Sequence, residues 1–207
     1  MMSLLTKERT VMANTYAPFG LRQYSGTGSA PTYEQVAMAI KSDYTTPVFY
    51  GDAVLQDANG YITRAGDSPT TQLAGVFYGC QYLSVAQKRT VWSNYWPGSD
   101  NNGDVIAYVV NDPNAKFVIQ AASGLNVTQA AVGASILTAG GSGGNTANGI
   151  SGMYAASVSA PSAPTDPFRV VGLVTAPPGA NGTDTSANAN YIIVSFLNVS
   201  TKTLVTI

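Results

Sequence analysis

The chain has 207 residues, of which 45% are hydrophobic and only 10% are charged, and its formal net charge at pH 7 is −1. This length and hydrophobic content exclude wholesale disorder and allow one large β domain or two small ones. A charge so close to zero produces no long-range field that would attract a phosphate backbone, so we expect no nucleic-acid partner.

The chain also lacks the side chains on which most proton-transfer enzymes and transition-metal sites rely. It contains no histidine and a single cysteine, Cys80, whereas such sites commonly use imidazole or clustered thiolates. We therefore expect no catalytic residue, no metal site and no cofactor. Cys80 ends the apolar run 76–80, which favours a small buried hydrophobe over a reactive thiol.

Neither a membrane span nor a secretory signal is evident in the sequence. No stretch approaches the ~20 apolar residues that cross a bilayer, so we expect no membrane partner. Residues 1–9 contain a leucine pair followed by mixed charges, whereas a secretory signal needs an apolar stretch of ~7–15 residues. We therefore expect synthesis in a cytoplasm.

The N-terminal part of the chain is expected to be an arm. Residues 1–15 form a loose polar segment, and extended structure is predicted to begin near Tyr16. In residues 17–22, the anchors Phe19 and Leu21 lie beside a proline and a glycine. This pattern suits an edge segment that is tucked against a sheet.

A β-hairpin is the clearest local signal. The apolar residues 53–55 lead into the turn 57–60, and residues 61–64 form the return strand. The turn contains Asn59-Gly60, and because both residues tolerate a positive φ, this pair strongly favours a hairpin. Residues 73–82 are then predicted to form another strand.

The next unit is a strand, a tight turn and a second strand. Residues 105–110 are apolar and β-branched, and residues 111–114 read Asn-Asp-Pro-Asn. Such residues favour a turn. Residues 117–120 then resume an apolar strand.

Residues 121–166 differ in composition, being rich in alanine, glycine, serine and threonine. The glycine run 140–144 is expected to be an exposed, flexible loop. A short helix is predicted over residues 127–134, capped by Asn126 or Thr128. The composition leaves open whether this region is a loop-rich insertion or a subdomain.

The C-terminal part contains two long, buried strands, residues 168–174 and 191–197, joined by a polar loop, and residues 203–207 add a last short strand. Together these elements predict an all-β fold, a β-barrel or a jelly-roll-like β-sandwich. It carries long Gly/Ser/Ala-rich loops and an extended N-terminal arm. We divide the chain into the arm 1–15 and a single β-rich domain 16–207.

Several apparent site motifs have ordinary interpretations. Residues 100–104 resemble the start of a calcium loop, but the closing glutamate is missing, so a solvated turn is favoured. The glycine run 140–144 lacks the Gly-Lys-Ser/Thr ending of a phosphate-binding loop. The aspartates lie mostly in turns, and no lysine has Ser-x-x-Lys spacing, so a hydrolase is a distant third hypothesis.

An aromatic run, residues 92–96, contains both tryptophans of the chain, Trp92 and Trp96, together with Tyr95. Tryptophan and tyrosine combine a flat apolar face with a polar group. The run has three interpretations, which the sequence leaves open: core packing, the anchor of a protein interface, or a platform for sugar rings.

The order of several short motifs resembles that of head decoration (cement) proteins of tailed bacteriophages. The motifs are residues 12–22, Gly51-Asp52-Ala53-Val54, Ala74-Gly75-Val76, Asp112-Pro113 before 117–120, and Gly172-Leu173-Val174. The resemblance covers most of residues 12–197, whereas residues 1–11 and 92–96 do not belong to the pattern.

The resemblance implies a structural protein of the virion that is made in the host cytoplasm. Such a protein binds the outer surface of the capsid as a homo-oligomer, a dimer or trimer, and stabilises contacts between major capsid protein subunits. The arm, residues 1–22, is expected to gain order on docking. The candidate capsid or oligomer interface comprises Tyr16, Pro18, Phe19, Leu21, Arg22, Trp92, Tyr95 and Trp96.

An alternative hypothesis is an outward-facing virion adhesin or tail-associated protein. It would bind host surface glycans through the aromatic run, with Trp92, Tyr95 and Trp96 as stacking platforms.

Overall fold

The computed structural model describes residues 13–26, 34–140, 143–159, 165–175 and 184–201. Apart from one 3₁₀ turn, η1 (Gln129–Ala131), the regular elements in these residues are strands, so the predicted all-β class is confirmed. The strands are β1 (Arg22–Ser25), β2 (Val36–Ile40), β3 (Ala53–Gln56), β4 (Ile62–Arg64), β5 (Leu73–Ser84), β6 (Arg89–Ser93), β7 (Val105–Val110), β8 (Lys116–Gln120), β9 (Ser135–Ala139), β10 (Gly144–Asn145), β11 (Ile150–Ser151), β12 (Tyr154–Ser159), β13 (Phe168–Leu173) and β14 (Tyr191–Phe196).

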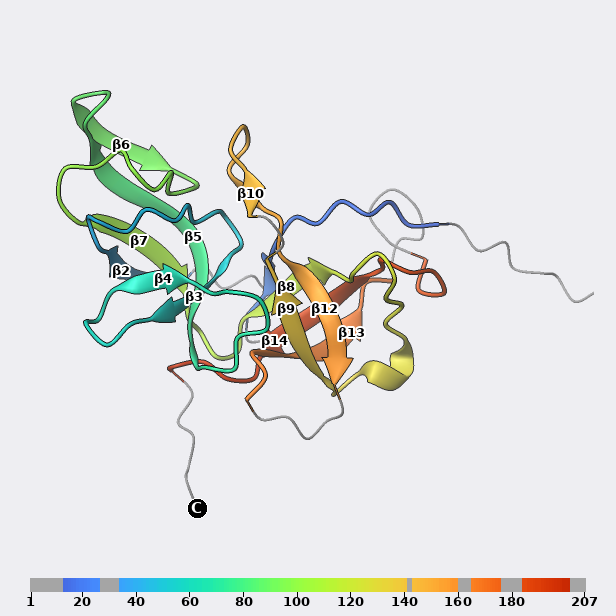
Figure 1. The fold of residues 1–207 in the computed structure, drawn as a ribbon. Helices are drawn as coiled ribbons and strands as arrows, with labels where there is room; N and C mark the ends of the chain where they lie inside the picture. The colour runs from blue at the N-terminus through green and yellow to red at the C-terminus, as the bar shows by residue number, and fades with distance from the viewer. Residues whose placement is uncertain (1–12, 27–33, 141–142, 160–164, 176–183, 202–207) are drawn as a thin grey trace, which may run out of the picture.

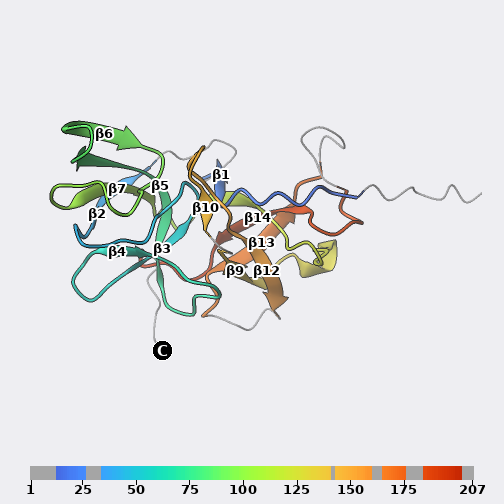
Figure 2. The same ribbon diagram turned by 45° about the horizontal axis from the view of Figure 1, so that its top comes forward.

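The strands form two antiparallel sheets and a small hairpin (Figures 1 and 2). Sheet A has the order β1-β8-β14-β13-β9-β12, and sheet B has the order β2-β7-β5-β3-β4, with β6 also paired to β5. Strands β10 and β11 pair only with each other. Within the described residues neither sheet closes into a barrel, so the sandwich alternative describes the fold better.

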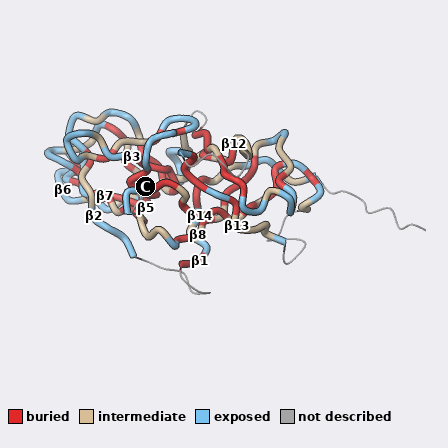
Figure 3. The backbone as a smooth tube through the Cα atoms, turned by 90° about the horizontal axis from the view of Figure 1, so that it is seen from below, coloured by how far each residue is buried: buried red, intermediate tan, exposed pale blue. Residues whose placement is uncertain are grey.

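The buried side chains form two clusters, and the first of them holds the two sheets together. The first cluster fills the space between the sheets and includes Val76 of β5 and Phe117 of β8. The second lies inside the curve of sheet B and includes Phe77. Because successive strand residues point to opposite faces, the neighbours Val76 and Phe77 serve different clusters. Figure 3 shows buried positions concentrated along the strands of both sheets.

The predicted hairpin is confirmed. Strands β3 and β4 are antiparallel, with Val54 opposite Arg64, and Gly60 in the turn has φ = 86°. The amide of Gly60 donates to the carbonyl oxygen of Asp57 at 3.1 Å. The chain therefore reverses where the Asn-Gly pair indicates.

The predicted unit at residues 105–120 forms, but its two strands do not pair with each other. Strand β7 lies in sheet B and β8 lies in sheet A. The turn between them, closed by a bond from the Ala115 amide to the Asp112 carbonyl oxygen, carries the chain from one sheet to the other. A turn motif gives the local bend, but it does not indicate which sheet the second strand joins.

The region 121–166 is more regular than its composition suggests. Its strands β9 and β12 pair with each other, and β9 also joins β13 of sheet A. The predicted helix at 127–134 is wrong: only η1 forms, and Thr128 makes no side-chain cap bond. Gly140 is buried and Gly144 lies in β10, whereas residues 141–142 lie outside the described residues.

Other expectations have mixed outcomes. Cys80 is buried, as predicted, and burial raises the pKa of its thiol to about 12. The strand expected at residues 203–207 and most of the arm, residues 1–12, lie outside the described residues. In the described part of the chain, no helix has the length and apolar character to cross a membrane.

Candidate interface surfaces

Residues 13–21, here called the strap, lie across the ends of β8, β12 and β14 of sheet A (blue in Figure 1). Gln120, fully buried at the end of β8, holds the strap at two points. Its Nε2 donates to the Thr15 carbonyl oxygen at 2.7 Å, and its Oε1 accepts from the Ala17 amide at 2.9 Å. Asn14 exchanges two bonds with the backbone of Asp184.

The strap ends where the chain enters the first core cluster. The amide of Gly20 donates to the Met153 carbonyl oxygen at 3.1 Å, and that of Leu21 donates to the Gly51 carbonyl oxygen at 2.9 Å. Gly20 has φ = 72°, and a Cβ at this position would lie 2.6 Å from Cβ of Ser151. A residue with a side chain does not fit there.

The structure separates the predicted interface residues of the strap, and Arg22 directly after it, into buried, half-buried and exposed groups. Leu21 is 0% exposed and belongs to the core, so its assignment to an interface is wrong for the folded chain. Pro18 and Phe19 are half-buried, and the Phe19 ring packs edge-on against Tyr191. Tyr16 is 41% exposed, and Arg22 is exposed with its guanidinium 4.8 Å from the Phe19 ring.

One exposed aromatic residue near the strap is absent from the sequence-based set. Tyr24 in β1 is 52% exposed, whereas Ser25 beside it is buried. Alternation along an edge strand is the signal that would have indicated it. Tyr16, Arg22 and Tyr24 are the large exposed side chains between residues 16 and 24.

The aromatic run 92–96 is divided among three environments. Trp96 is 0% exposed, meets Tyr82 edge-on at 5.2 Å, and donates from Nε1 to the Tyr44 carbonyl oxygen at 3.2 Å. Tyr95 is half-buried and stacks on Phe49. Core packing is therefore the correct interpretation for Trp96, and its assignment to an interface is wrong.

Trp92 is the accessible member of the run. Its side chain is 67% exposed and stacks on Tyr108 of β7, with ring centroids 5.5 Å apart and planes inclined by 10°. The two residues come from strands on opposite sides of β5, where Gln81 pairs with Trp92 on one side and with Ile106 on the other. The stack therefore spans β5.

We call the solvent-facing side of strands β7, β5 and β6 the outer face. It is formed by Gly79, Gln81, Leu83, Trp92, Ile106 and Tyr108. Leu83 and Ile106 are exposed hydrophobic residues, and none of these residues is charged. The alternating burial of β7 places Ile106 and Tyr108 on this side. The sequence of β7 is a continuous apolar run and gives no sign of this alternation.

A cleft of about 410 Å³ opens on the outer face beside Trp92. No charged side chain is among the lining residues that the structure describes. They are Gln35, Tyr78, Gly79, Cys80, Trp92, Ser93, Asn94 and Tyr108. The lining thus combines aromatic rings with amide and hydroxyl groups.

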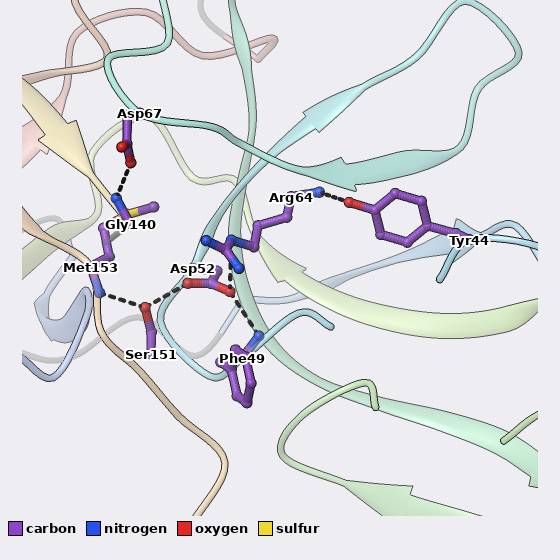
Figure 4. A network of polar contacts seen from close by, with 8 residues as sticks. All are labelled: Tyr44, Phe49, Asp52, Arg64, Asp67, Gly140, Ser151 and Met153. Carbon is purple, nitrogen blue, oxygen red and sulfur yellow. Dashed lines mark hydrogen bonds and ion pairs between the residues drawn. The ribbon is translucent and has the colours of Figure 1, made fainter. Parts of the chain in front are cut away.

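A buried polar network lies where the strap enters the core, and it links the turn before β3 to the segment between β11 and β12 (Figure 4). The carboxylate of Asp52, 1% exposed, accepts bonds from the Ser151 hydroxyl and from the Phe49 amide. The Ser151 oxygen in turn accepts from the Met153 amide at 2.9 Å. Nε of Arg64 lies 3.8 Å from the Asp52 carboxylate. Burial raises the pKa of Asp52, and these partners only partly oppose that rise.

The carboxylates of Asp100 and Asp104, in the predicted turn 100–104, accept bonds from loops and a strand end of sheet B. Asp100 accepts from the Ser84 hydroxyl and from the Ala86 amide, and Asp104 accepts from the Ser42 amide and from the Tyr61 hydroxyl. These bonds fit the predicted turn better than a calcium loop. Among the described residues, no group of three or more His, Cys, Asp or Glu side chains could hold a metal ion.

Comparisons with known proteins found no relative of this chain. No protein-family model, no curated protein and no solved structure matches the chain. The function of the chain is therefore inferred from the strap, the outer face and the motifs in the sequence.

Proposed function

We propose that the chain is a decoration protein of a tailed-phage head that binds the outer surface of the shell and stabilises contacts between major capsid subunits. The single observation that carries the proposal is the strap. Its extended backbone is fixed to sheet A by Gln120 and Asn14, and Tyr16 and Tyr24 beside it are exposed. The order of motifs along residues 12–197 supports the same function.

The state of the strap changes how docking would work. The sequence suggests an arm that gains order on binding, but residues 13–22 are already bonded to the folded domain. Binding through a pre-organised segment avoids the free-energy cost of ordering a flexible chain. Tyrosine and arginine are enriched among the residues that dominate interface energies, so Tyr16, Arg22 and Tyr24 are the expected shell contacts.

Stable attachment requires more area than these side chains supply alone. A specific interface buries on the order of 1,000 Å² or more, so each copy must contact the shell with neighbouring surfaces as well. A homo-oligomer, a dimer or trimer, would present several straps at once and strengthen attachment through multivalency. The protein would then lie on the outside of the virion after synthesis in the host cytoplasm.

The proposal is tested by binding of the purified protein to shells that lack it. The double variant Tyr16→Ser/Tyr24→Ser removes the two exposed aromatic rings in residues 16–24. We expect its shell affinity to fall by about 10-fold or more, since each tenfold corresponds to about 1.4 kcal/mol. Occupancy is measured by sedimentation of shells with bound protein.

The matched control is Leu83→Ser/Val85→Ser, which removes two exposed apolar side chains from sheet B and its adjoining turn. This control should occupy shells like the original chain. Circular dichroism establishes that both variants are folded. Unchanged occupancy by the tyrosine variant would remove the strap from the shell interface.

A further inference from the structure

We propose that the cleft beside Trp92 on the outer face is a binding subsite for a neutral pyranose sugar. This activity is separate from shell attachment, which the strap provides. It also differs from an adhesin built on the whole aromatic run, because Trp96 is buried and Tyr95 packs on Phe49.

The first argument is the stacking surface. Trp92 stacks on Tyr108 through one ring face, and its 67% exposure leaves the rest of the indole open to solvent. A pyranose ring presents an apolar C–H face bordered by hydroxyl groups. A flat, exposed indole that carries its own polar group is suited to that face.

The second argument is the polar part of the cleft. Gln35, Ser93 and Asn94 contribute amide and hydroxyl groups to the lining, and such groups both donate to and accept from sugar hydroxyls. Asn94 is held in place because its Nδ2 donates to the Asn148 carbonyl oxygen at 2.7 Å. The polar groups are therefore gathered around the aromatic platform.

The third argument is charge. None of the described residues that line the cleft is charged, so these residues offer no ion-pair partner to a phosphate, a sulfate or a sialic acid. A neutral polyhydroxyl ligand needs no such partner. The charge character of the lining thus selects neutral sugars over acidic ones.

The fourth argument is space. The cleft of about 410 Å³ falls within the range of small-molecule sites, about 300–1,000 Å³. Gly79 keeps it open, because a Cβ at this position would lie 3.0 Å from the Ser93 carbonyl oxygen and 3.7 Å from Cα of Asn94. Both of those residues line the cleft.

The test is ligand-observed NMR of the full chain with methyl glycosides of glucose, galactose, mannose and N-acetylglucosamine, and with sialic acid as the charged comparison. A single subsite of this kind is expected to bind at least one neutral glycoside with a Kd of about 1 mM, which is typical of weak, one-ring recognition. Trp92→Ala should weaken that binding at least about 10-fold. The matched control Tyr24→Ala, which removes an exposed aromatic ring elsewhere, should leave it unchanged.

Three results would overturn the subsite: no binding of any neutral glycoside, equal binding by Trp92→Ala, or stronger binding of sialic acid. Sedimentation of the free protein tests whether copies of the chain bind to one another through the outer face. Self-association that Trp92→Ala abolishes would make the outer face a contact between copies of the chain instead. Shell occupancy by Trp92→Ala, expected to be unchanged, keeps this test independent of the proposed decoration function.

Discussion

At the scale of single residues, Asp52 is a turn residue whose buried carboxylate binds groups from distant parts of the chain. Its carboxylate receives the Phe49 amide from its own turn and the Ser151 hydroxyl from β11. Those two groups, with Arg64 nearby, satisfy a charge that is almost completely removed from solvent. Because burial still dominates and raises the pKa, ionisation of Asp52 costs folding free energy.

This cost predicts a pH dependence of stability. The folded-state pKa of Asp52 is raised above its ordinary value of 3.8, so the folded state holds the proton more tightly than the unfolded state. The stabilisation is fully present below pH 3.8 and is lost as the pH rises through the folded-state pKa. As the pH rises, the free energy of unfolding of the original chain should therefore fall relative to that of the Asp52→Asn variant.

The contrasting variant is Asp100→Asn, because bonds from the Ser84 hydroxyl and the backbone lower the pKa of Asp100. The stability that Asp100 contributes is present above pH 3.8 and is lost as the pH falls through its lowered pKa. Urea denaturation from about pH 2 to pH 7 measures both differences. Equal pH slopes for the original chain and Asp52→Asn would contradict the account of Asp52.

The sequence could predict only part of the site at this scale. Burial of Cys80 followed from local composition, but the neighbours Tyr95 and Trp96 are indistinguishable in the sequence from Trp92. Their different environments come from Phe49 and Tyr82, which are distant in the chain. Residue type gives the capacity to stack, and the tertiary fold decides which ring remains free.

At the scale of elements, strand identity follows from composition, whereas pairing does not. The apolar, β-branched segments became β5, β7, β13 and β14 close to the expected bounds. The partners of β7 and β8 were not predictable, because the turn that joins them bends the chain in the same way whether it closes a hairpin or connects two sheets. The attachment of the strap could not be predicted either, because Gln120, which binds it, lies about 100 residues further along the chain.

Two glycines in the connection from β6 to β7 test how tightly that loop is packed. Gly98 and Gly103 both have φ = 92°, but a Cβ at Gly98 would lie 2.2 Å from the Thr45 carbonyl oxygen, whereas a Cβ at Gly103 has no neighbour within 4 Å. Gly103→Ala should cost only the left-handed penalty, about 1–2 kcal/mol. Gly98→Ala should cost about 1–3 kcal/mol more, because the overlap adds to it.

The free energy of unfolding of the two alanine variants, measured by urea denaturation, decides this point. Gly103→Ala serves as the matched control, since the two positions share the same backbone angle. Equal losses of stability would show that the loop shifts to make room for the added methyl group, and that the contact with Thr45 does not hold the loop in place.

At the scale of the whole molecule, the two sheets share one core. Ala53, Leu73, Val76 and Val110 from strands of sheet B lie in the same buried cluster as Phe117, Phe168 and Phe196 of sheet A. The Asp52 network links the turn before β3 of sheet B to Ser151 of β11 and to Met153, which precedes β12 of sheet A. The strap and the outer face are therefore carried on a single packed body. The all-β class followed from the sequence, but the strand order did not, because sheet order depends on contacts between distant segments.

The central claim is that this body is attached to the outside of a phage shell through the strap. If the chain is encoded by a phage, as proposed, cryo-electron microscopy of purified particles of that phage tests the claim most directly. The account predicts density for the two packed sheets on the outer surface of the shell, with Tyr16, Arg22 and Tyr24 facing neighbouring capsid subunits. Absence of this density from purified particles, or attachment with the strap turned away from the shell, would contradict it.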